Sequence, residues 1–288
     1  MKRRTVTVSS EQKLIKALVP GVVSDESEAA RLLTRGAVYV NGKRAKHDVL
    51  VQPGQILSAV LEESGREAKH KSLKFEIEVL FEDADVLVLN KPSGQVAQPT
   101  PGRVGESLID TATTHLKHEA GLVHRLDRET SGVTIFGKHA KATAALAEAF
   151  RLGEAKKRYL AVTVAGLKAK GVIDLPLSKD PSRPGRWRAS KQANGISAVT
   201  NFERLFDGEY ALVSLFPQTG RTHQLRAHLA GLGHPILGDT LYGGPGDMRC
   251  LLHAQSLRVL GRTFHAPVPD DVRVYFEKSG TAVPEGEW

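Results

Sequence analysis

Residues 62–71 are charged or small and carry no apolar periodicity, whereas the chain from Leu73 onward is dense in apolar residues. A segment of this composition has no face to bury and is typical of a linker. It predicts a small domain over residues 1–61, a linker over residues 62–72 and a large domain over residues 73–288. The length of 288 residues agrees with two domains.

Basic residues are concentrated in the smaller part. The whole chain has 40 lysines and arginines against 32 acidic residues, a net charge of +8. Residues 1–61 alone hold ten basic and five acidic residues. Such a surface attracts polyanions through counterion release and electrostatic steering, which favours nucleic acid as a partner. Ordinary solubility is the alternative explanation of the same charge.

Several classes of protein are disfavoured by what the sequence lacks. No run of about 18 apolar residues occurs, so no membrane span is expected. The single cysteine, Cys250, excludes an internal disulfide and a zinc site of several thiolates. No His-Glu-x-x-His or strand-linked Gly-x-Gly-x-x-Gly pattern occurs, so neither a metal nor a cofactor is expected. A cytoplasmic monomer is the simplest expectation.

The small domain is predicted to hold two helices and a hairpin. Apolar residues at helical spacing between Leu14 and Val19 indicate the first helix, and residues 28–35 the second. Asn41-Gly42 lies between two extended runs, and both residues accept the positive φ of a hairpin turn. A turn and a further strand are expected over residues 49–60.

This order of elements over residues 10–60, with the stretch "LLTRGAVYVNGK", resembles the S4 RNA-binding module. The resemblance implies a small α/β domain that presents a basic face to structured RNA. The residues expected to bind RNA there are Arg31, Arg35, Lys43 and Arg44. A small domain with a solvated basic face remains the alternative.

The large domain shows short strand and helix patterns without a regular βαβ order, and strands adjacent in sequence are joined by short turns. Strands are expected over residues 75–80, 86–89, 133–136, 158–164, 197–206 and 210–216, and helices over residues 106–117, 141–152 and 222–230. This arrangement predicts an α+β fold, with a largely antiparallel mixed sheet and flanking helices.

A polar loop over residues 124–132 carries the strongest chemical signal. Asp127 lies between Arg125 and Arg128, and an ionised carboxylate can act as a nucleophile or a base. A structural loop aspartate is the alternative from these residues alone.

The full string "HRLDRETSG" is similar to the signature loop of the RluA-type pseudouridine synthases. Further segments resemble the family's other motifs in the same order: "VLVLNKPSGQ", "KKRYLAVTVAG" and "PQTGRTHQLRAHLAGLGHPILGDTLYGG". "RCLLHAQSL" resembles the helix that often follows. The first motif continues into Gln98-Pro99, where the family often has a histidine.

The resemblance implies roles for five residues. Asp127 corresponds to the catalytic aspartate, Tyr159 to the tyrosine that packs on the target base, and Arg221 to the arginine that pairs with the aspartate. Leu225 corresponds to an apolar wall of the base pocket, and Arg125 to the arginine that fills the space of the flipped base.

The resemblance implies isomerisation of uridine to pseudouridine in structured RNA, without a cofactor or a metal. Because family members with an S4-like module mostly modify large-subunit ribosomal RNA, that RNA is the favoured substrate, and transfer RNA is the alternative. A non-catalytic ribosome-assembly factor is a second hypothesis. A glycoside hydrolase using Asp127 and Glu129 is a third.

Overall fold

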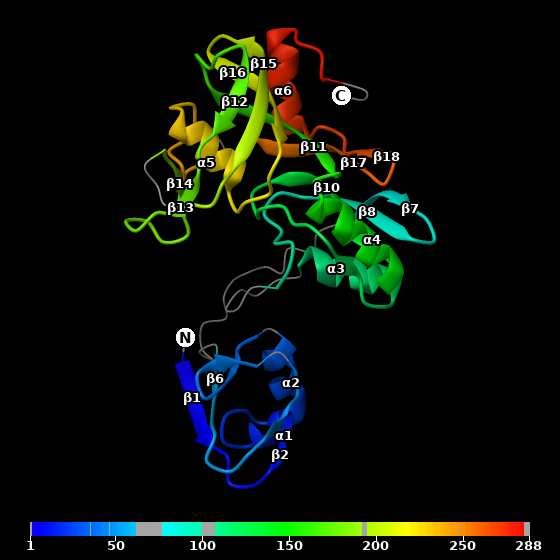
Figure 1. Ribbon diagram of the computed structural model, residues 1–288, viewed down its shortest axis with the longest axis vertical. Coiled ribbons are helices and arrows are strands. Elements are labelled where there is room, and N and C mark those ends of the chain that lie inside the picture. The colour runs from blue at the N-terminus through cyan, green and yellow to red at the C-terminus, as the bar shows by residue number, and fades with distance from the viewer. Residues whose placement is uncertain are drawn as a thin grey trace. The chain divides into compact units, whose positions relative to one another are not determined.

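Figure 1 shows the computed structural model of the chain. It describes residues 2–34, 36–45, 47–61, 77–99, 107–191, 195–246 and 248–284. The chain forms two compact units, the first from residues 1–74 and 98–107 and the second from residues 75–97 and 108–288. The predicted linker over residues 62–72 lies outside the described residues, so its boundaries stay a prediction.

The first unit is a four-stranded antiparallel sheet, in the order β1-β6-β3-β4, with two helices and a further strand pair. Its elements are β1 (Lys2–Thr7), β2 (Gln12–Lys13), α1 (Leu14–Ala17), α2 (Glu26–Thr34), β3 (Val38–Val40), β4 (Lys43–Arg44), β5 (Leu50–Val51) and β6 (Ile56–Leu61). Apolar residues of both helices and of the strands β3, β5 and β6 form its core.

Local signals explain the ends of these elements. Asn41 and Gly42 have φ of 48° and 78° and form the predicted turn between β3 and β4. Helix α2 starts two residues before its predicted start because Asp25 Oδ1 accepts a hydrogen bond from Glu28 N, at 2.8 Å. The Glu28 carboxylate in turn accepts from Ser24 N, at 3.1 Å.

The basic residues predicted to bind RNA lie on α2 and β4. Arg31, Lys43 and Arg44 are exposed. The Arg44 guanidinium lies across Gly36, where a Cβ would be 1.6 Å from its Nη2. Arg35 lies outside the described residues.

The second unit is built on a ten-stranded sheet, in the order β12-β15-β16-β11-β17-β10-β8-β7, with β18 paired to β17 and β9 to β10. Its strands are β7 (Glu78–Glu82), β8 (Val86–Lys91), β9 (Gly121–Leu122), β10 (Ser131–Gly137), β11 (Lys156–Val164), β12 (Lys170–Asp174), β15 (Val199–Asp207), β16 (Tyr210–Pro217), β17 (Leu252–Val259) and β18 (Arg262–His265). Among the described pairs of this sheet, only β10 and β17 run parallel. The predicted α+β class with a largely antiparallel sheet is therefore confirmed.

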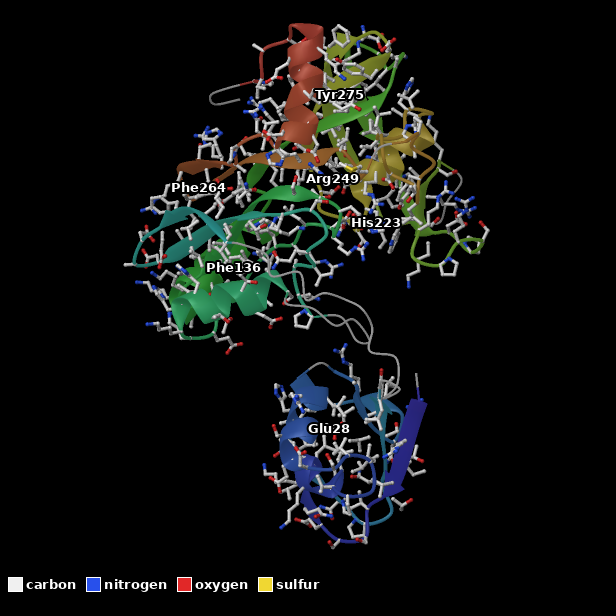
Figure 2. The ribbon with its side chains drawn as sticks, turned by 180° about the vertical axis from the view of Figure 1, so that it is seen from behind. Glu28, Phe136, His223, Arg249, Phe264 and Tyr275 are labelled. Atoms are coloured by element: carbon white, nitrogen blue, oxygen red, sulfur yellow. The ribbon has the colours of Figure 1, made fainter. Side chains whose placement is uncertain are left out.

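Helices cover the sheet and explain its continuous apolar runs. They are α3 (Leu108–Leu116), α4 (Ala140–Arg151), α5 (Gln224–Gly231) and α6 (Asp270–Ser279). Alternate residues of β8 point to opposite faces: Leu87 packs with Phe136 and Leu108 of α3, and Val88 with Leu146 of α4. Figure 2 shows Phe136 in this part of the unit. None of the described helices is long and apolar enough to cross a membrane.

The segment "RCLLHAQSL" was expected to be a helix, and this expectation is wrong. It contributes β17, which is paired with β10 on one side and with β11 on the other. Residues 252–257 are all buried. A short run buried on both faces has the same apolar pattern in a strand as in a helix, so pairing with neighbours decides its structure.

A small antiparallel hairpin, β13 (Leu177–Lys179) and β14 (Trp187–Ala189), stands apart from the large sheet. It packs on α5, where Gly231 lies against Ala189. The turn of this hairpin carries Arg183 and Arg186.

Candidate active site

A cavity of about 730 Å³ brings together residues that lie far apart in the sequence. All five residues given a role in the large domain line it: Arg125, Asp127, Tyr159, Arg221 and Leu225. They come from the loop before β10, from β11, from the turn after β16 and from α5. The end of α4 forms a further wall.

The loop that carries Asp127 is held in place by the last residue of β8, Lys91. The Lys91 side chain is fully buried, and its Nζ donates to the carbonyl oxygens of Pro92 (2.8 Å), Gln95 (2.7 Å) and Arg128 (3.1 Å). Burial lowers the pKa of Lys91 to about 7, although the negative charge of Asp127 acts to raise it. Lys91 therefore acts on the loop through hydrogen bonds, and its burial keeps it from contacting RNA.

The other end of the loop is fixed to β17. Gly132 has a φ of 117°, and a Cβ there would lie 2.1 Å from the carbonyl oxygen of Ala254. Next to it, Ser131 Oγ lies 3.0 Å from His253 Nδ1. Glycine is required at residue 132 because the two parallel strands meet directly beneath the loop.

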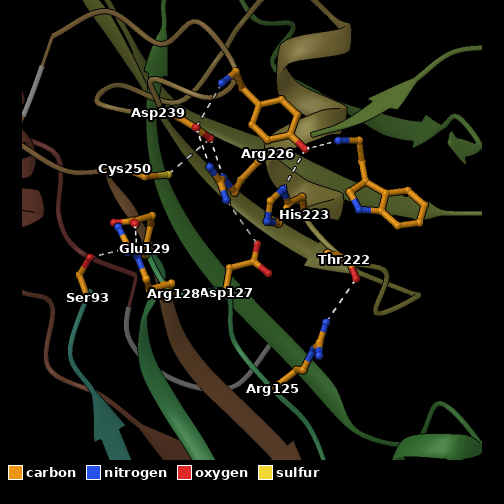
Figure 3. A network of polar contacts seen from close by, with 12 residues as sticks. Ser93, Arg125, Asp127, Arg128, Glu129, Thr222, His223, Arg226, Asp239 and Cys250 are labelled. Atoms are coloured by element: carbon orange, nitrogen blue, oxygen red, sulfur yellow. Dashed lines mark hydrogen bonds and ion pairs between the residues drawn. The ribbon is translucent and has the colours of Figure 1, made fainter. Parts of the chain in front are cut away.

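Figure 3 shows that the cation facing Asp127 is Arg226. Its Nη1 lies 3.8 Å from Asp127 Oδ2. Its Nε and Nη2 donate to the two oxygens of Asp239, each at 2.7 Å. Arg226 and Asp239 are 4% and 1% exposed. Burial alone would lower the pKa of Arg226, but the hydrogen bonds with Asp239 raise it, so the guanidinium stays charged beside Asp127.

The expected pair of Arg221 and Asp127 is not formed in the described part of the chain. Arg221 is exposed, and its Nε donates to the carbonyl oxygen of Ser197, at 3.2 Å. Arg221 precedes α5, whereas Arg226 lies in its first turn, on a buried face. The sequence did hold a signal for this: Arg226 stands between the apolar residues Leu225 and Ala227, and a buried arginine needs a carboxylate partner.

The Tyr242 ring packs against the Arg226 guanidinium. The Arg226 guanidinium carbon lies 5.0 Å from the centre of the Tyr242 ring. Tyr242 Oη accepts from Trp187 N (3.0 Å) and lies 3.1 Å from His223 Nδ1. Burial raises the pKa of Tyr242 to about 12 and lowers the pKa of His223. These contacts connect the hairpin β13–β14 to the arginine that faces Asp127 (Figure 3).

Tyr159 and Leu225 form apolar walls of the cavity. They are 9% and 7% exposed. The pairing of β11 with β17 shifts register between Arg158 and Tyr159. Burial, and then the charge of Asp127, raise the pKa of Tyr159 above its ordinary value. Tyr159 is therefore a neutral phenol, which can pack on a base but is not a phenolate.

Arg125 lies at the exposed side of the cavity. It is exposed, and its Nη2 lies 3.5 Å from Thr222 Oγ1. Glu129 turns away from Asp127, because its carboxylate accepts from Arg128 Nε at 2.7 Å (Figure 3). The structure thus gives Asp127 an arginine partner and leaves Glu129 in a separate ion pair.

The histidines near the cavity serve the scaffold. His124 Nε2 accepts from Ile135 N at 3.0 Å, and its ring stacks on Phe150 with centres 4.6 Å apart. Burial lowers its pKa to about 3. Within the described ranges, no group of three or more histidine, cysteine or acidic side chains could hold a metal ion.

Comparisons with known proteins agree on one family. The family model described as RNA pseudouridylate synthase matches residues 85–231. The chain is 35% identical over 265 residues to the uncharacterized RNA pseudouridine synthase YhcT of Bacillus subtilis, covering 83% of this chain and 85% of that protein. It is 31% identical over 275 residues to ribosomal large subunit pseudouridine synthase D of Vibrio cholerae, covering 83% and 82%. The structure of human RNA pseudouridylate synthase domain containing 4 is similar, with a TM-score of 0.59, 25% identity and coverage of 72% of this chain and 94% of that chain.

Proposed function

The chain belongs to the RNA pseudouridylate synthase family, and we propose that it isomerises specific uridines of large-subunit ribosomal RNA to pseudouridine. The RNA pseudouridine synthase activity follows from the family. The observation that carries the proposed site is the cavity that holds Asp127 with its arginine partner beside Tyr159 and Leu225. The choice of RNA is supported by relatives named ribosomal large subunit pseudouridine synthase D.

The reaction breaks the bond between uracil N1 and ribose C1′, turns the base and forms a bond between C5 and C1′. The proton on C5 then leaves to water and N1 takes up a proton, so the product is an isomer and no electron donor or acceptor takes part. In our proposal Asp127 starts this sequence by attacking C1′ or by removing the proton from C2′. Both routes need an unprotonated carboxylate within reach of the ribose.

Arg226, rather than Arg221, is proposed to hold that carboxylate. Its planar guanidinium is fixed by two hydrogen bonds to Asp239 and by the Tyr242 ring, with Nη1 left facing Asp127. A guanidinium held at three points orients a carboxylate better than a lysine ammonium could. Arg221 lines the cavity from its exposed side and is proposed to contact RNA.

The target uridine is proposed to leave the RNA stack before it reacts. Flipping a nucleotide costs a few kcal/mol, and stacking on an aromatic side chain returns about 1–3 kcal/mol per base. The neutral Tyr159 ring and Leu225 supply the apolar surfaces for the base. Arg125, at the exposed side, is suited to fill the space that the base leaves in the stack.

The first unit is proposed to dock RNA through its basic residues. Arg31 is exposed on α2, and Lys43 and Arg44 are exposed on β4. Arg35, the residue after α2 in the sequence, is proposed to belong to the same set. Contacts of this kind bind phosphate without reading sequence, so they would raise affinity for any structured RNA.

The test is tritium release from RNA transcribed with tritium at uridine C5. The proposal predicts release into water from large-subunit ribosomal RNA, with no free uracil. Release from transfer RNA instead would contradict the proposed substrate. Free uracil would indicate a hydrolase. Tight binding without release would contradict the activity.

A further inference from the structure

Lys157 places an ammonium group in the wall of the active-site cavity. It lies on β11, two residues before Tyr159, and lines the same cavity as Asp127. Its Nζ lies 5.9 Å from the centre of the Phe150 ring, at the end of α4. On the other side, a Cβ built on Gly220 would lie 3.7 Å from the same Nζ. The ammonium therefore sits between the end of α4 and the turn before α5.

Among the described residues, no carboxylate, carbonyl or hydroxyl pairs with the Lys157 ammonium, which lies over the Phe150 ring. Burial lowers its pKa, and its charge helps to lower the pKa of His124. Lys157 is half-buried, and a charged group partly withdrawn from water is usually paired, so an ammonium that lines a cavity without an anion is suited to bind one from outside the chain.

We propose that Lys157 binds a phosphate of the RNA backbone next to the target uridine. This inference rests on the proposed function, which brings RNA into this cavity. Phosphate is the anionic group of RNA, and the compact charge of lysine suits it. Asp127 is the carboxylate that shares the cavity wall, and it is already paired with Arg226. The phosphate thus fixes the ribose between Lys157 and Asp127.

A uracil carbonyl oxygen is the other group that could reach Lys157. A neutral carbonyl compensates a desolvated charge less than an anion does, so phosphate is the better partner. The two can be separated by salt, because a phosphate contact releases counterions and a base contact does not.

The experiment measures kcat/KM for tritium release from the ribosomal transcript, for wild type and for K157M, K157Q and K157R, against KCl concentration. The slope of log kcat/KM against log salt should become shallower by about 0.7–0.9 in K157M and K157Q, with kcat/KM at least about tenfold lower at low salt. K157R should keep the wild-type slope, since a guanidinium also binds phosphate. Lys156 is the matched control: it is exposed, and its Nζ donates to Gly153 O at 2.9 Å. K156M should change neither quantity.

Equilibrium binding to the shortest ribosomal transcript fragment that wild type retains repeats the test without turnover when wild type and each Lys157 variant also carry Asp127→Asn. A shallower salt slope in K157M and K157Q supports the phosphate site. An unchanged salt slope with reduced kcat/KM overturns the phosphate site in favour of a base contact. No change in the salt slope or in kcat/KM overturns any role of Lys157 in binding the substrate. Absence of tritium release by wild type would contradict the proposed function, while the binding slopes would still decide the role of Lys157.

Discussion

Replacing Asp239 by asparagine tests whether the buried carboxylate sets the position of Arg226. Removing one partner of a buried ion pair costs about 3–5 kcal/mol. Part of this free energy is regained if the Arg226 guanidinium moves toward Asp127, so that the distance from Nη1 to Oδ2 shortens from 3.8 Å to a hydrogen-bond distance. At an effective dielectric constant of about 20, closing to about 2.8 Å gains about 1.5 kcal/mol. The expected loss in the free energy of unfolding is therefore about 1.5–3.5 kcal/mol.

The same closure predicts a slower reaction. Asp127 would have to leave an ion pair about 1.5 kcal/mol stronger before it could act on the ribose, which corresponds to about a tenfold lower rate. Single-turnover tritium release at saturating RNA measures this rate. RNA affinity should not change, because Asp239 is buried away from the cavity mouth.

Unfolding in urea, followed by tryptophan fluorescence, measures the stability of the second unit alone. The sequence of the first unit contains no tryptophan, whereas Trp187 lies on β14 of the second unit. Asp271 gives the matched control: it also binds an arginine, Arg249, but its side chain is 35% exposed. D271N should cost less than about 1 kcal/mol. Equal losses for the two variants, or an unchanged rate in D239N, would refute the reasoning.

Two further predictions concern the support beneath the loop. Gly132→Ala places a Cβ 2.1 Å from Ala254 O, so it should cost about 3 kcal/mol or more in urea unfolding. Gly185→Ala, also at positive φ but with open space around it, should cost only about 1–2 kcal/mol; similar losses would contradict the steric argument. Burial lowers the pKa of His253 to about 4. At His253 the unfolded chain therefore binds a proton between about pH 6.5 and 4 that the folded chain does not, so this residue makes stability fall with falling pH, by at most about 1.4 kcal/mol per unit. His124, whose pKa is lowered to about 3, acts in the same direction. His253→Gln should reduce the dependence by the share of His253, and an unchanged dependence would contradict the assignment.

Local patterns predicted most of the elements because the signals that set them lie within a few residues. The hairpin at Asn41-Gly42 depends on two residues that accept positive φ. The loop around Asp127 is one continuous stretch of sequence, so the sequence alone identified both the candidate carboxylate and the loop that carries it. Helix α2 begins two residues before its predicted start because its first turn is fixed by the Asp25 cap and not by the apolar pattern that indicates the rest of the helix.

The failures concern features that depend on the folded neighbours. The sequence of β17 does not alternate between apolar and polar residues, because both faces of the strand are buried. Its apolar run therefore did not distinguish it from a helix. Arg221 and Arg226 lie in the same motif, and only the start of α5 decides which of them faces Asp127. The partner of Arg226, Asp239, lies thirteen residues away in a loop, and no spacing rule connects the two.

The most direct test of the proposed chemistry compares tritium release by wild type, Asp127→Asn and Glu129→Gln. Both variants remove one carboxylate from the same loop and keep its shape. We predict no detectable release by D127N with RNA binding retained, and release by E129Q within a few-fold of wild type, because Glu129 is held by Arg128. Release by D127N at the wild-type rate, or its loss in E129Q alone, would contradict the assignment of the reaction to Asp127.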